Sequence, residues 1–236
     1  MSYNEIHKRC LTVGTPESAK GAARFFKTGK GEYGEGDIFI GINTPTVRAL
    51  SKEFKDLDLS EVKKLFHSEI HEERSIGIAI LNRQYEKAVK SDDLKTQTRL
   101  YKKYFSWRKR VNNWDLVDSS APYLSGHYYF HQDDTDLYKL LKSSNLWERR
   151  IAILSCFYFI RQKAFDIPLE IIETRLFDKE DLMHKACGWM LREIGNRDIT
   201  LLRSFLKKHA AVMPRTSLRY SLEKLNPVER KKWMAK

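Results

Sequence analysis

Apolar residues recur at intervals of three and four along almost the whole sequence. The pattern is clear in four segments, LSEVKKLF (59–66), RSIGIAILNRQYEKAV (74–89), LWERRIAILSCFYFIRQ (146–162) and ITLLRSFLKKH (199–209). This spacing places the apolar side chains on one face of an α-helix. Alternating strand patterns between turns are hard to find. The sequence therefore predicts an all-α fold of about a dozen helices.

Turn and capping residues divide these helices. The segments TPESAK (15–20), TPTVRA (44–49) and NPVERK (226–231) each place a capping residue before a proline at the first helical position. The segment KTGKGEYGEGD (27–37) holds four of the eleven glycines. We expect it to be a long ordered loop between helices. It is not a phosphate-binding loop, since the GxxxxGK[ST] pattern is absent.

Three of the helical segments can be aligned as a repeat, namely EERSIGIAIL (72–81), WERRIAILSC (147–156) and MHKACGWMLR (183–192). Each has a basic residue followed three positions later by a small one, which gives Arg74 with Gly77, Arg149 with Ala152, and Lys185 with Gly188. The spacing is about 36 residues, with one empty repeat near residue 113. A single domain over residues 1–236 is predicted, built as a superhelical solenoid of antiparallel helix pairs with a concave face.

The repeat register groups four residues that carry chemistry. Arg150 lies 36 positions after Trp114, and the next equivalent position is Ala186. Trp189 lies one helical turn beyond Ala186, and Asp118 one turn beyond Trp114. We therefore expect Trp114, Asp118, Arg150 and Trp189 to line one side of successive helices.

The charge of the chain favours a polyanionic partner. Lys and Arg number 43 against 31 Asp and Glu, a formal net charge of +12. Nucleic acid is favoured over an anionic membrane surface, and a basic but unspecialised surface is the remaining alternative. Charge bears on association and not on the fold.

The cysteines and the apolar runs indicate the compartment. Cys156 and Cys187 stand in apolar segments and, like Cys10, have no partner at disulfide-framework spacing. We expect buried free thiols and a reducing compartment. No signal-peptide core and no apolar run near 18 residues are visible. The sequence predicts a cytoplasmic protein with no membrane partner.

The pair Trp114 and Asp118 raises a question of charge. A carboxylate beside a polyanion is repelled unless a positive charge forms there, as in an oxocarbenium-like sugar with a departing cationic base. An indole face also attracts cations. The pair is therefore a candidate for glycosidic cleavage in nucleic acid, the alternative being a core Trp with a capping or solvated Asp. Asp115 lies about 100° around the helix from Trp114 and is better placed to bond a neighbouring helix.

Other polar residues give weaker signals. Arg149 and Arg150 are adjacent but point in different directions, so one could brace the solenoid while the other binds phosphate. Arg192 lies three residues after Trp189. The pairs His67/His71 and His127/His131 have metal-like spacing, but spacing supplies no third ligand, so we expect satisfied or surface histidines and no metal site.

Four ordered blocks then resemble a known family. The blocks are FIGINTPTVRAL (39–50), NNWDLVD (112–118), LWERRIAIL (146–154) and KACGWMLRE (185–193), and FFKTGKGEYGEGD and MPRTSLRYSLEK are also similar. Together they resemble the AlkD-type DNA alkylation repair family, which are HEAT-like-repeat DNA glycosylases. The resemblance runs from about residue 20 to residue 225.

This resemblance implies removal of cationic N3- or N7-alkylated purines, such as 3-methyladenine and 7-methylguanine, from duplex DNA. It implies that Asp118 is the catalytic carboxylate, that Trp114 and Trp189 flank the lesion, and that Arg150 is the functional Arg. The remaining residues expected to bind DNA are Thr44, Arg48, Arg149, Lys185 and Arg192. No cofactor is implied, and we expect a monomer.

Two other functions remain open from the sequence. One is a non-catalytic binder of damaged or branched DNA on the same scaffold. The other is a HEAT-type protein–protein scaffold, which would leave both the charge of +12 and the Trp, Asp and Arg positions without a role.

Overall fold

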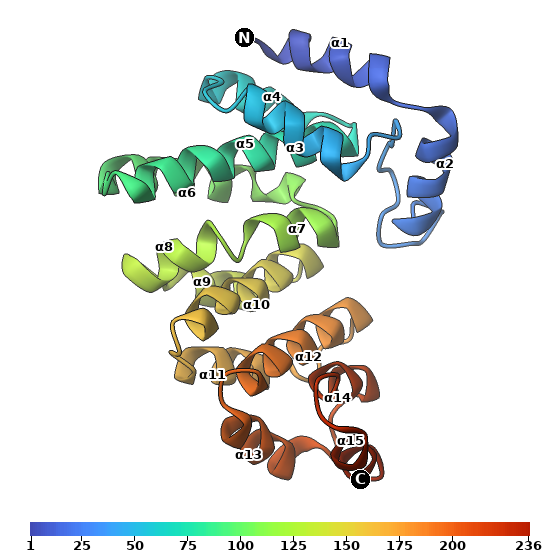
Figure 1. The fold of residues 1–236 in the computed structure, drawn as a ribbon, viewed down its shortest axis with the longest axis vertical. Coiled ribbons are helices and arrows are strands. Elements are labelled where there is room, and N and C mark those ends of the chain that lie inside the picture. The colour runs from blue at the N-terminus through green and yellow to red at the C-terminus, as the bar shows by residue number, and fades with distance from the viewer. The chain divides into compact units, whose positions relative to one another are not determined.

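The computed structural model describes all 236 residues, and they form an all-α fold (Figure 1). The only β-type pairing is an isolated bridge between Ile38 and Ile70. The helices are α1 (Tyr3–Val13), α2 (Pro16–Phe25), α3 (Thr44–Glu53), α4 (Leu59–His67), α5 (His71–Lys90), α6 (Leu94–Trp107), the 3₁₀ helix η1 (Arg108–Arg110), α7 (Trp114–Ser120), α8 (Ser125–His131), α9 (Thr135–Leu141), α10 (Leu146–Arg161), α11 (Asp166–Arg175), α12 (Asp181–Gly195), α13 (Ile199–His209), α14 (Arg215–Ser221) and α15 (Pro227–Met234).

The chain divides into two compact units, residues 1–120 and 121–236. In the first unit α5 is central, because α3, α4, α6 and α7 all pack against it. In the second unit α10 packs against α8, α9, α11 and α12, and α12 packs in turn against α13 and α14. One long buried helix therefore organises each set of neighbours. That residues 1–236 act as a single domain stays a prediction.

The predicted all-α class is confirmed, although the structure has more helices than expected. The additional ones include α8, α9 and α14, each of seven residues. Two turns of helix are too short to show a repeating apolar pattern. The predicted caps Thr15 and Asn226 are confirmed, but the one at Thr44 is wrong. There Asn43 is the cap, in line with the stronger preference of Asn for that position, and α3 begins at Thr44.

The small residues of the repeat lie where helices approach closely, as predicted. A Cβ atom added at Gly77 would be 2.9 Å from the Leu65 Cβ atom on α4. One added at Gly188 would be 2.5 Å from the Tyr220 Cβ atom on α14 and 2.6 Å from the Ser217 carbonyl oxygen. A side chain larger than hydrogen therefore cannot fit at Gly188 unless α12 and α14 move apart.

Two of the three basic residues of the repeat make equivalent contacts. Arg74 and Arg149 are buried, and each donates to the carbonyls five and six residues before it and to one aspartate. The aspartates are Asp37 and Asp178 respectively. Lys185 differs because it pairs with Asp181 on its own helix, at 2.9 Å. The first two repeats thus share a buried arginine that ties the start of a long helix to the preceding loop.

Two further predictions concern the apolar parts of the chain. Cys10, Cys156 and Cys187 are free and buried, which confirms the expectation of core thiols. None of the helices combines the length and the apolar character needed to cross a membrane.

Replacing Gly188 by alanine should destabilise the protein by about 1–3 kcal/mol, because the added methyl overpacks the contact between α12 and α14. Urea unfolding followed by circular dichroism measures this change. Gly21→Ala is the control, since nothing lies within 4 Å of a Cβ atom added there. That control should be neutral or stabilise by up to roughly 1 kcal/mol. Equal midpoints for Gly188→Ala and the wild type would contradict the close approach.

Candidate functional site

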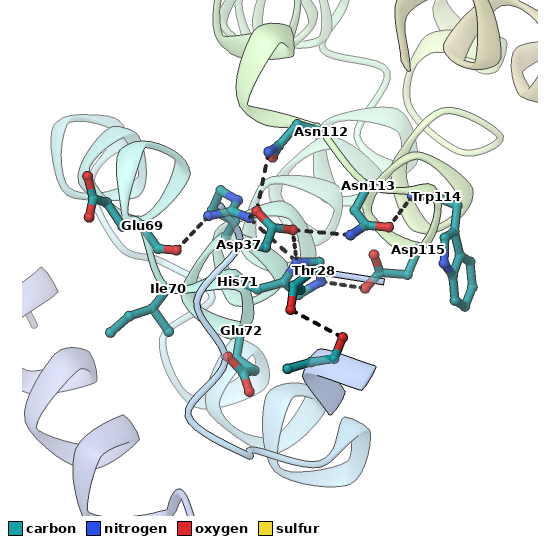
Figure 2. A network of polar contacts seen from close by, with 12 residues as sticks. Thr28, Asp37, Glu69, Ile70, His71, Glu72, Asn112, Asn113, Trp114 and Asp115 are labelled. Carbon is teal, nitrogen blue, oxygen red and sulfur yellow. Dashed lines mark hydrogen bonds and ion pairs between the residues drawn. The ribbon is translucent and has the colours of Figure 1, made fainter. Parts of the chain in front are cut away.

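A buried polar network in the first unit is built around Asp37, which lies in the loop between α2 and α3 (Figure 2). The Asp37 carboxylate accepts hydrogen bonds from Arg74 at 2.5 Å, Asn113 at 3.1 Å and Asn112 at 3.3 Å. Its Oδ2 also lies 3.0 Å from Nδ1 of His71. One side chain therefore joins the loop, α5 and the turn before α7.

His71 extends this network to α7. While Nδ1 of its ring faces Asp37, Nε2 lies 2.8 Å from Oδ2 of Asp115. The imidazole is buried and also stacks against the ring of Phe39, with centroids 4.4 Å apart. The prediction that Asp115 bonds a neighbouring helix is confirmed, since α5 carries His71.

The network shifts the titration of two of its members. Burial alone raises the pKa of Asp37, but the hydrogen bond from His71 and the nearby charge of Arg74 outweigh burial and hold this pKa at about 2. Burial alone lowers the pKa of His71, but the contacts with Asp115 and Asp37 outweigh it and raise this pKa. Both groups are thus held in their charged forms.

Glu72 fixes the end of the same loop, immediately before α3. Its carboxylate accepts the backbone N–H groups of Ile40, Gly41 and Ile42, at 3.1, 2.8 and 3.2 Å. Gly41 has a φ of 86°, in the left-handed region that favours glycine. The three bonds set the direction in which α3 begins, and hence the positions of Thr44 and Arg48.

Thr44 and Arg48 are exposed and lie one helical turn apart on α3. Arg48 makes no ion pair with a carboxylate. Both residues line a cavity of about 330 Å³ that is also lined by Phe26, Phe39 and Asp115. The structure therefore brings the two predicted phosphate contacts of α3 close to the buried network.

Trp114 and Asp118 lie one turn apart on α7, and both are partly exposed. The Trp114 backbone N–H donates to Oδ1 of Asn113 at 2.8 Å. The indole stacks on Phe26, with centroids 5.2 Å apart and planes 20° apart, and meets the edge of Phe25 at 5.8 Å. Both ends of α7 are held, because Asn82 of α5 donates to the Ser119 carbonyl at 2.7 Å.

The second unit contains the other predicted residues. Arg149 is 4% exposed and binds Asp178 through Nε at 2.7 Å and Nη2 at 3.0 Å. Arg149 therefore braces the fold, and its expected contact with DNA stays a prediction. Arg150 is buried to the same extent, with 4% of its surface exposed. Arg150 donates from Nη1 to the Leu182 carbonyl of α12 at 2.5 Å.

Trp189 and Arg192 lie one turn apart on α12. The Trp189 ring lies 6.0 Å from that of Phe157, and its Nε1 donates to Glu193 at 3.3 Å. Arg192 forms an ion pair with Glu223. The expectation that these residues share a side with Trp114 and Asp118 concerns both units and stays a prediction.

The roles of Asp37 and His71 were not predicted from the sequence. His71 was considered only as half of a metal-like pair with His67, and its ring proves to be satisfied by carboxylates. No group of three or more potential metal ligands is present. Arg74 could have indicated such a network from the sequence, because it is a cation within an apolar segment. A buried cation of this kind requires a carboxylate partner.

Comparisons with known proteins bear on this arrangement. The model of the DNA alkylation repair enzyme family matches residues 6–225. The chain belongs to this family. Membership supports a role in DNA repair, with DNA as the substrate. A search of curated proteins found no significant match.

One solved structure has the same fold. It is described as a predicted DNA alkylation repair enzyme from Enterococcus faecalis, and it aligns with a TM-score of 0.71 over 91% of this chain and 97% of that chain. The sequences are 18% identical, so the likeness concerns the fold.

Asp37→Asn should lower the stability of the protein at neutral pH by at least roughly 2 kcal/mol, from the difference between an ordinary pKa of 3.8 and one of about 2. Because the folded pKa is depressed, the carboxylate stabilises the protein above pH 3.8 and loses this effect as the pH falls toward 2. Urea midpoints measured at several pH values for both proteins should therefore converge in acid. Asp56→Asn, at a half-exposed residue, is the control. A constant difference between Asp37→Asn and the wild type would contradict this role.

Proposed function

We propose that this protein is a DNA glycosylase that hydrolyses the N-glycosidic bond of cationic N3- or N7-alkylated purines in duplex DNA. The carrying observation is the arrangement on α7, where an indole and a carboxylate lie one turn apart on a helix held at both ends. The net charge of +12 supports DNA as the partner, and an acid in such a chain is best used beside a transient cation.

In the proposed reaction the bond between C1′ and the purine nitrogen breaks, and its electron pair leaves with the base. The leaving base is already cationic and becomes neutral, so no strong general acid is required. Asp118 stabilises the oxocarbenium-like sugar and positions the water that adds to C1′, and this water releases one proton to the solvent as the new C–O bond forms. Trp114 and Trp189 pack on the deoxyribose and hold the cationic nucleotide.

The remaining predicted residues are proposed to bind the DNA backbone. Thr44 and Arg48 stand at the start of α3, where backbone N–H groups and a free guanidinium suit a phosphate. Arg150, Lys185 and Arg192 are the proposed phosphate contacts of the second unit, each of which exchanges a present partner for DNA. The proposal treats residues 1–236 as one monomeric domain and requires no cofactor.

Asp118→Asn should reduce the single-turnover rate of base release by about 10²–10³-fold, because a neutral amide no longer stabilises the developing cation. The measurement is chromatography of free 7-methylguanine and 3-methyladenine released from methylated duplex DNA. Asp166→Asn, at an exposed residue of α11, should act like the wild type.

The affinity of each protein for the same DNA separates the possible outcomes. Similar affinity with lost release supports a catalytic role for Asp118. If the wild type binds DNA tightly but releases no base, the glycosylase proposal is contradicted. The alternative, a non-catalytic binder of damaged or branched DNA, is then favoured.

Arg48→Ala should weaken binding to any duplex and reduce the slope of log K against log salt by about 0.9, the value for one phosphate contact. Fluorescence anisotropy at several salt concentrations measures this slope. Arg9→Ala is a matched control, because Arg9 already pairs with Glu53. An unchanged slope for Arg48→Ala would remove Arg48 from the interface, and binding that ignores salt would contradict a DNA partner.

A further inference from the structure

His71 lies between two carboxylates, and this geometry determines its protonation. Nδ1 faces Asp37 at 3.0 Å and Nε2 faces Asp115 at 2.8 Å. A carboxylate only accepts hydrogen bonds, so both ring nitrogens must donate, and a histidine has two donors only as the imidazolium. The bridge from the loop to α7 is therefore complete only while His71 carries its proton.

The two ends of this bridge are not equally dependent on His71. Asp37 has Arg74, Asn112 and Asn113 as further donors. Asp115 has no other partner, and its Oδ1 is buried without a hydrogen bond. The contact with His71 therefore matters most for α7, where Asp115 directly follows Trp114.

We propose that protonated His71 is a positioning residue that orients Trp114 and Asp118 by holding Asp115, so that base release slows as His71 loses its proton. This inference rests on the proposed glycosylase function. His71 touches neither substrate nor reacting atoms in this proposal, and it acts through the first turn of α7.

The surroundings of His71 set the direction of the pH effect. The charged groups around it are Asp37 from the loop, Asp115 from α7 and Arg74 from α5, with Arg110 of η1 acting on Arg74. The two carboxylates outweigh burial and raise the pKa of His71. The bridge is thus intact below the ordinary pKa of histidine and is lost as the pH rises through the higher, folded value.

Loss of the proton has a specific consequence for the network. The neutral ring keeps one N–H and turns one lone pair toward a carboxylate. Nη2 of Arg74 lies 3.5 Å from Nδ1 and can donate a hydrogen bond to that nitrogen. The partner of Nε2 is Asp115, which can only accept a hydrogen bond. With the remaining proton on Nε2 the bond to Asp115 persists but loses the positive charge of its donor and weakens, and with that proton on Nδ1 the bond is lost. In either form the start of α7 keeps its contacts through Asn113 and Trp114, but its attachment through Asp115 is weaker.

The test is the pH dependence of single-turnover base release between pH 5.5 and 9.5, with DNA affinity measured in parallel. The variants are His71→Gln and Asp115→Asn, and the control is His7→Gln. His7 also faces a carboxylate of α5, with Nδ1 2.6 Å from Oε1 of Glu73, but it belongs to α1 and does not touch α7.

The wild-type rate should fall on the alkaline side. His71→Gln should be about 10–100-fold slower near neutral pH, as expected for a small misplacement of a catalytic group, and should lack this fall. In Asp115→Asn the fall should move to lower pH, because one of the two carboxylates that retain the proton is gone. His7→Gln should match the wild type. Wild-type rate and pH profile in His71→Gln would overturn the inference.

A second measurement does not depend on base release. In NMR titrations the imidazole of His71, assigned by its absence in His71→Gln, should titrate above the ordinary range, and the amide signals of Trp114–Ser120 should shift with the same midpoint. Amides of α7 that do not follow His71 would overturn the positioning role. A wild type that releases no base at any pH, but whose α7 follows His71, would contradict the glycosylase function and leave the structural link supported.

Discussion

A guanidinium buried at the start of a long helix is the interaction on which the first unit depends. Arg74 is 1% exposed, and an unpaired charge at such a site costs about 3–5 kcal/mol. Asp37 must therefore lie against it, which fixes the glycine-rich loop. Once Asp37 is fixed, Asn113 and His71 are fixed as well, and they determine where α7 begins. The aromatic and acidic residues of α7 are thus placed by a cation that touches neither of them.

The acids near this site divide into two groups. Asp37, Glu72 and Asp115 are used for structure, since each accepts hydrogen bonds that join separate elements of the unit. The charges of Asp37 and Asp115 are balanced within the protein by Arg74 and His71, and Glu72 is bound by backbone N–H groups. Asp118, one turn beyond Trp114, is a fourth acid and not one of these three. In the proposed function, the carboxylate that acts at the DNA is therefore a different one from the three that hold the unit together.

Patterns within single helices predicted much of this fold. They could not predict contacts between segments that lie far apart in the sequence. The 3.6-residue period predicted the helices, and the repeat register predicted that Gly77 and Gly188 lie at close contacts. The angle between Asp115 and Trp114 predicted a bond to another helix. No local pattern links Asp37 to His71, 34 residues later, because the loop between them has no period. Equally, the bracing role of Arg149 depends on Asp178, which lies 29 residues later in the loop between α11 and α12.

The two buried arginines differ in one respect, the direction along the chain in which each finds its aspartate. Asp37 precedes Arg74, whereas Asp178 follows Arg149 by 29 residues. During synthesis from the N-terminus, Arg74 therefore emerges with its partner already made. Asp178 is synthesised 29 residues after Arg149, which corresponds to a delay of roughly 1.5–6 s at about 5–20 residues per second. Two repeats with the same final geometry therefore form in a different order during synthesis. On the ribosome, Arg149 of α10 is made before its partner Asp178, whereas Arg74 of α5 is made after Asp37.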